Sequence, residues 1–118
     1  MNRRLIVMVA VFSLFLAGHA LAADVAAGKR VAKQKCEGCH GATGEGNGVM
    51  LQALNVTTPP VSWTDKSAMA AFTDADLAKI ITGGGAAVGK PPLMPAFKGQ
   101  LNDAKIADVI AYIRSLAQ

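Results

Sequence analysis

The 118-residue sequence has little of the material from which small proteins usually build a core. It contains one Trp, one Tyr and four Phe, so aromatic side chains are scarce. Its two cysteines lie only three positions apart, and a disulfide between them would close a tiny loop that adds little stability. Because chains of this size often depend on a metal or cofactor, the scarcity predicts a prosthetic group that supplies the missing apolar mass.

The sequence also lacks the strong positive charge of nucleic-acid-binding proteins. Twelve Lys and Arg face eight Asp and Glu, a net charge of +4. Arg3 and Arg4 lie in a segment that we expect to be removed, which leaves ten against eight and a net charge of +2. A charge this small argues against nucleic acid as a partner.

The N-terminus has the pattern of a secretory signal peptide, which we assign to residues 1–22. A short basic start precedes an uncharged apolar run at 5–17, and small residues at 20–22 form a cleavage site near Ala22 or Ala23. The alternative is a retained membrane anchor, but a span needs about 20 apolar residues and this run is shorter. We therefore predict a periplasmic protein without stable membrane insertion after cleavage.

The remaining chain predicts an all-α fold, because no segment alternates between apolar and polar residues over a useful length. Helices are expected where a capping residue precedes apolar periodicity. We predict a helix at 25–35 after Asp24, one turn within 49–54, and a short helix from Asp65 to near 72. A further helix should begin at the Thr73-x-x-Asp76 capping box and end at the glycines at 83–85, and a last helix should follow Asn102. The segments at 41–48, 55–64 and 86–100 are rich in Gly or Pro and should be irregular. Loops this long need a reason in a compact domain, and wrapping around a flat cofactor is such a reason.

The first and last helices each carry one apolar face. Gly28 and Ala32 lie on the face of the first, where their small size suggests that another helix approaches closely. The stripe of the last helix comprises Ile106, Val109, Ile110, Ile113 and Leu116, with Tyr112 beside it and Leu101 placed as a hydrophobic staple.

The segment Cys36-Glu37-Gly38-Cys39-His40 is a C-x-x-C-H motif, the attachment pattern of haem c. Two thiols at this spacing can each bond one vinyl group of a porphyrin, and the adjacent His40 then lies beneath the iron. A thioredoxin-like dithiol would need a βαβ context, and a zinc site would need four ligands. We therefore expect one covalent haem c bound by Cys36 and Cys39, with His40 as an iron ligand.

The second axial ligand is predicted to be Met94. His19 falls in the signal peptide, so the mature chain has no second histidine, and Met, Lys, water or an open position remain. Met50 is very close to His40 in sequence, and Met69 falls in a predicted helix as a core residue. Met94 lies far along the chain before Pro95, in a stiff loop that can reach the other haem face.

These motifs resemble those of class I monohaem cytochromes c. The resemblance covers residues 24–118, which we assign to one cytochrome c domain: the first helix with 28–32, the methionine loop at 93–97 and the last helix. It implies a cytochrome c fold in which the first and last helices cross. The chain departs from the family at Ala32, where an aromatic residue is common, and this change is expected to loosen the crossing.

Three features near the haem motif have open interpretations. A backbone carbonyl near Thr58 or Pro59 is a candidate acceptor for His40 Nδ1, since ligating histidines normally have such a partner. Trp63 is either a donor to a haem propionate or a core residue. The lysines that border the haem motif and methionine loop either dock redox partners or are ordinary surface residues; they are Lys33, Lys35, Lys90 and Lys98.

The sequence thus predicts a one-electron carrier rather than an enzyme. Its partners would be a protein donor and a protein acceptor in an extracytoplasmic electron-transport chain. The alternative is an electron-entry cytochrome subunit of a periplasmic oxidoreductase complex. A third possibility, an enzyme or gas sensor, requires the position opposite His40 to be open.

Overall fold

The computed structural model describes residues 22–118, so the predicted signal peptide lies outside the described residues except for its last position, Ala22. The described chain is helical and contains no β-strand, only an isolated bridge between Lys98 and Leu101, which agrees with the all-α prediction. Its elements are α1 (Val25–Lys35), α2 (Glu37–His40), α3 (Met50–Ala53), α4 (Lys66–Met69), α5 (Asp74–Gly83), the 3₁₀ turn η1 (Gly85–Val88) and α6 (Asp103–Leu116). None of the helices described is long and apolar enough to cross a membrane.

Helix α1 begins where the sequence predicts, and its cap also joins the two ends of the domain. The Asp24 carboxylate accepts a hydrogen bond from the Ala27 N–H at 3.0 Å. The Asp24 N–H donates to the Asp108 carboxylate of α6 at 2.7 Å. The start of α1 is therefore fixed both by its own cap and by the last helix.

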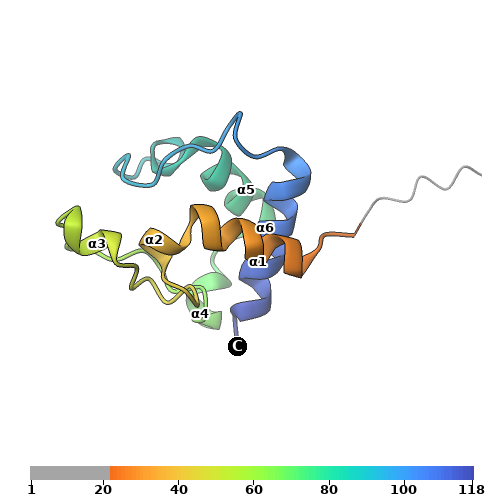
Figure 1. Ribbon diagram of the computed structural model, residues 1–118, viewed down its shortest axis with the longest axis horizontal. Helices are drawn as coiled ribbons and strands as arrows, with labels where there is room; N and C mark the ends of the chain where they lie inside the picture. The colour runs from red at the N-terminus through yellow and green to blue at the C-terminus, as the bar shows by residue number, and fades with distance from the viewer. Residues whose placement is uncertain (1–21) are drawn as a thin grey trace, which may run out of the picture.

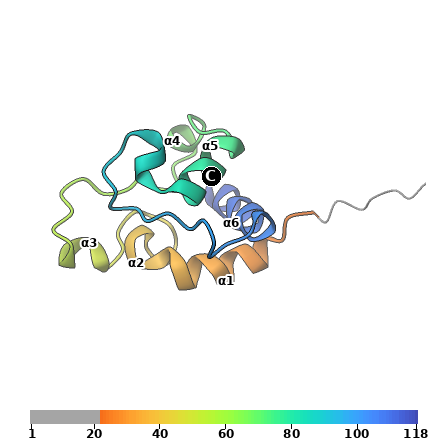
Figure 2. The ribbon, with the colours of Figure 1, turned by 90° about the horizontal axis from the view of Figure 1, so that it is seen from above.

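Helix α1 crosses α6 toward the end of the domain opposite α3 (Figures 1 and 2). Gly28 lies at the contact, and a Cβ at this position would overlap the Asp108 carbonyl and come within 2.9 Å of the Val109 nitrogen. Only glycine lets the two backbones approach so closely. The apolar stripe of α6 is buried together with Ala32, as the sequence predicts, except that Leu116 at its end is only partly buried.

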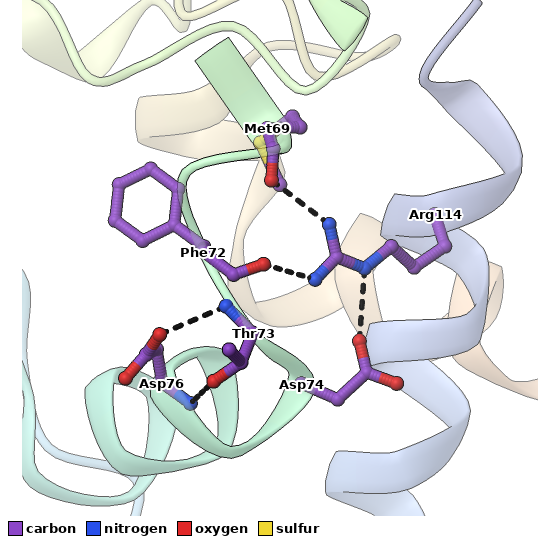
Figure 3. Close-up of polar contacts among 6 residues, drawn as sticks. All are labelled: Met69, Phe72, Thr73, Asp74, Asp76 and Arg114. Carbon is purple, nitrogen blue, oxygen red and sulfur yellow. Dashed lines mark hydrogen bonds and ion pairs between the residues drawn. The ribbon is translucent and has the colours of Figure 1, made fainter. Parts of the chain in front are cut away.

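Arg114 of α6 ties α4 and α5 to the crossing (Figure 3). Its guanidinium donates to the Met69 carbonyl at 3.0 Å and to the Phe72 carbonyl, and its Nε lies 2.9 Å from an Asp74 carboxylate oxygen. Helix α4 was expected to continue to near residue 72 but ends at Met69. The carbonyls that would have continued the helix are bonded to Arg114 instead.

Helix α5 begins with the predicted capping box. The Thr73 N–H donates to the Asp76 carboxylate at 2.8 Å, and the Asp76 N–H donates to the Thr73 hydroxyl at 3.1 Å (Figure 3). The hydrogen bond from the Thr73 N–H to the Asp76 carboxylate is the main cause that lowers the pKa of Asp76, and the Thr73 side chain contributes as the second cause. The box therefore fixes the start of α5, the helix whose other end holds the segment around Met94.

Candidate haem site

The two cysteines and His40 are presented by a single helical turn. After Cys36, which ends α1, residues 37–40 form α2, an element that the sequence did not predict. The His40 N–H donates to the Cys36 carbonyl at 2.9 Å, and the Cys39 N–H approaches the same carbonyl at 3.2 Å. Side chains three positions apart share one face of a helix, so both thiols face the same side. Both are free and half-buried.

Burial keeps the Cys36 thiol and the His40 imidazole uncharged at neutral pH. Burial, reinforced by the nearby Cys39, raises the pKa of the Cys36 thiol to about 11. Burial also lowers the pKa of His40 to about 4. A neutral imidazole is the form that binds a metal ion, because a protonated ring has no free lone pair.

The glycine-rich segment after α2 folds back onto the haem motif. The Gly46 N–H donates to the His40 carbonyl at 2.8 Å, and the Gly48 N–H donates to the Cys39 carbonyl at 3.1 Å. These bonds satisfy the carbonyls at the end of α2, which a helix of one turn leaves without internal partners. They hold the backbone of His40 in place.

The expected acceptor for His40 Nδ1 is not present. Among the described residues, Nδ1 is the one buried side-chain nitrogen or oxygen without a hydrogen-bond partner, so the carbonyls near Thr58 and Pro59 do not serve as its acceptor. The imidazole instead stacks on Trp63, with ring centroids 4.5 Å apart and planes inclined by 22°. Nothing local in the sequence indicates this contact, because the two residues are far apart in the chain.

Met94 lies on a loop that is fastened to the end of α5. The Gly85 N–H donates to the Met94 carbonyl at 3.1 Å, and the Lys90 N–H donates to the Gly85 carbonyl at 2.9 Å. Beyond Met94, the Phe97 N–H donates to the Ile81 carbonyl at 3.0 Å. The turn η1 lies within this loop, where the sequence predicted irregular structure. The loop is therefore held on both sides of Met94.

The three methionines of the described chain occupy different environments. Met69 is 2% exposed in the core, as the sequence suggested, whereas Met50 on α3 is 49% exposed. Met94 is partly buried and packs against the same core cluster as Cys36. Helix α3 and the loop before Met94 lie at the same end of the molecule, away from the start of α1 (Figures 1 and 2).

These residues fit a covalently attached haem. Two thiols on one face of a turn match two vinyl groups, and the neutral His40 follows them directly. The half-buried thioether of Met94 is a suitable soft ligand. Large apolar side chains are exposed at the two ends of α3 and on the segment that leads to Met94, and such surface suits contact with an apolar cofactor; they are Val49, Leu54, Val88 and Leu93.

A cavity of about 190 Å³ is lined by residues of α1, α2 and α6. Ala32, Trp63 and Tyr112 line it, with Lys29 and Lys33 at its rim. Ala32 is the position at which the sequence departs from its apparent family. The small side chain of Ala32 lines this space together with Trp63, while the crossing itself stays tight at Gly28.

The chain is similar to cytochromes c in both sequence and structure. The family model described as Cytochrome c matches residues 25–117. The chain is 38% identical over 103 residues to a cytochrome c6 from Picosynechococcus sp., covering 84% of this chain and 79% of that protein. It is 32% identical over 114 residues to a cytochrome c6 from Synechocystis sp., covering 97% and 82%. The solved cytochrome c6 of the diatom Phaeodactylum tricornutum superimposes with a TM-score of 0.55 at 29% identity, covering 78% of this chain and 92% of that one.

Proposed function

The chain belongs to the cytochrome c family, and from that membership we propose that it carries single electrons in a periplasmic electron-transport chain with His40 and Met94 as axial iron ligands. Members of this family are electron carriers rather than enzymes, and they hold one haem c covalently. The class of function and the cofactor thus follow from the family. The ligand pair and the cellular compartment are the proposed part.

The placement of Met94 carries the proposal for the ligand pair. Cys36 and Cys39 would form thioethers, and His40 offers a neutral ring nitrogen from the same turn. Met94 offers its sulfur from a loop that backbone hydrogen bonds fasten to α5. When bound, the haem supplies the Fe(III)/Fe(II) couple. With His40 and Met94 both engaged, no position is left for a substrate, which suits a carrier.

Substitution of Met94 tests the ligand pair. Met94→Ala should abolish the weak near-infrared band of the Fe(III)–sulfur bond, because the sulfur is removed from the iron. The matched controls are Met50→Ala, at an exposed methionine, and Met69→Leu, which keeps the bulk of a core methionine. Both should retain the band. A band that survives Met94→Ala would place the sixth ligand elsewhere.

The compartment rests on the sequence of residues 1–22. We propose that this segment is removed near Ala22 or Ala23, which leaves residues 24–118 as the cytochrome c domain. Intact mass measurement of the protein from a periplasmic fraction should give a chain that starts at Ala23 or Asp24 and carries one haem. A full-length chain in the membrane fraction would contradict the proposal. A species found only within a larger complex would indicate an electron-entry subunit.

Partner docking is assigned to the four exposed lysines at 33, 35, 90 and 98. Charge complementarity speeds the encounter of redox partners more than it tightens their complex. Electron transfer to an acidic partner should therefore slow as salt rises, since screening shortens to about 8 Å at 0.15 M. Replacing Lys35 and Lys98 with Gln should remove much of this dependence. Replacing the exposed Lys66 and Lys105 is the matched control. A rate that does not vary with salt would make all four lysines ordinary surface residues.

A further inference from the structure

His40 lacks the polar partner that usually orients a ligating histidine. Such a ring normally donates its second N–H to a carbonyl, carboxylate or water, which fixes the ring plane. Here Nδ1 is buried and has no hydrogen-bond partner within residues 22–118. Rotation of the imidazole about its bond to Cβ must then be limited by packing. The indole of Trp63 lies against the ring face, at 4.5 Å between centroids and 22° between planes.

Trp63 is itself fixed in position, so its indole can restrain the imidazole that lies against it. It is 7% exposed, and its backbone N–H donates to the Gly44 carbonyl at 2.7 Å. Gly44 has φ of +76°, and a Cβ there would lie 2.5 Å from the indole Cε3. The indole therefore occupies the space that any other side chain at position 44 would fill. The Ser62 and Thr64 hydroxyls on either side of Trp63 lie 2.9 Å apart and brace the turn.

We propose that Trp63 is a positioning residue for His40: its indole face fixes the plane of the imidazole in place of a hydrogen bond. This inference rests on the proposed function, because the plane of the ring matters only if His40 ligates the iron. Stacking restrains rotation of the ring without accepting a proton. The imidazole is then a less basic ligand than one with a hydrogen-bonded Nδ1, which favours the reduced iron over the oxidised iron.

The alternative role of Trp63 is simple core packing, and variants of the haem-loaded protein separate the two. In the oxidised protein, the order of the four haem methyl resonances reports the orientation of the axial ligands. Trp63→Leu, which keeps an apolar side chain but no ring, should change that order. Trp63→Phe, which retains a ring that can stack, should preserve it. Ile110→Ala is the control, since Ile110 is as buried as Trp63 but lies on α6, which carries no proposed haem ligand.

The outcomes decide the proposal whether or not a variant is stable. A lowered melting temperature with an unchanged methyl order in Trp63→Leu would overturn it and leave Trp63 as a core residue. If Trp63→Leu does not fold, the reduced wild-type protein gives the answer. Nuclear Overhauser contacts between the indole and the His40 ring protons are expected, and their absence would refute the stack. Failure of the proposed function would look different, because the wild-type spectrum would then show no iron-bound histidine.

Discussion

The two halves of the domain are stabilised in different ways. The crossing of α1 and α6 buries its own apolar side chains against a close backbone contact at Gly28. The segments at 41–64 and 84–100 bury few side chains, and backbone hydrogen bonds hold them instead. They also expose large apolar residues, including Val49 at 85%. We therefore expect the two irregular segments to depend on the haem more strongly than the crossing does.

Removal of the haem attachment should break this contrast most strongly. With Cys36→Ala and Cys39→Ala together, the haem is no longer attached to the chain. We expect amide hydrogen exchange across 41–64 and 84–100 to accelerate by about 100-fold or more, because local opening of these segments no longer has to break contacts with a bound cofactor. The central residues of α1 and α6 should remain more protected than these segments. Hydrogen exchange followed by mass spectrometry measures both regions in one sample. Equal acceleration in both regions would show that the crossing also requires haem.

A larger side chain at position 28 should destabilise the crossing of α1 and α6. Gly28→Leu places a side chain where even a Cβ overlaps the Asp108 carbonyl, so α1 and α6 must separate. We expect the free energy of unfolding to fall by about 3 kcal/mol, as in other overpacked sites. Ala26→Leu places the same leucine side chain at an exposed position of α1 and should change stability little. Thermal unfolding of the two haem-loaded variants compares them. Similar melting temperatures for the two variants would show that the close contact at Gly28 does not contribute to stability.

Filling the cavity beside Ala32 should give the smallest effect and the opposite sign. Ala32→Phe places a ring in the space of about 190 Å³ that Trp63 and Tyr112 line. Cavity-filling substitutions commonly add about 1 kcal/mol to the free energy of unfolding. Ala32→Leu, which fills less of the space, should add less. Denaturant unfolding of both variants measures the change. A loss of stability in both would mean that the space is already closed in solution.

The features that the sequence predicts correctly are those that depend on neighbouring residues. The caps at Asp24, Thr73 and Asn102 and the stripe of α6 lie where the sequence predicts them, because each depends on residues within one or two turns. The C-x-x-C-H motif is local as well, and the family comparison supports the haem c that it predicts.

The contacts that the sequence did not reveal are long-range. Arg114 ends α4 from more than 40 positions away, and no pattern near Phe72 indicates it. The stacking of Trp63 on His40 depends on how the glycine-rich segment folds back, as does the missing acceptor for Nδ1. Periodicity and caps describe single elements, whereas these contacts arise only when several elements pack together. The environment of His40 was therefore the least predictable part of the site.

A potentiometric titration of the haem-loaded protein, monitored by its optical spectrum, tests the central claim most directly. If His40 and Met94 both ligate the iron, the titration should show one reversible one-electron wave, with low-spin spectra in the oxidised and reduced states. This is the behaviour of an electron carrier whose iron has no open position. A high-spin spectrum of the reduced protein would contradict the account, because it would mean that the position opposite His40 is free for a substrate or gas.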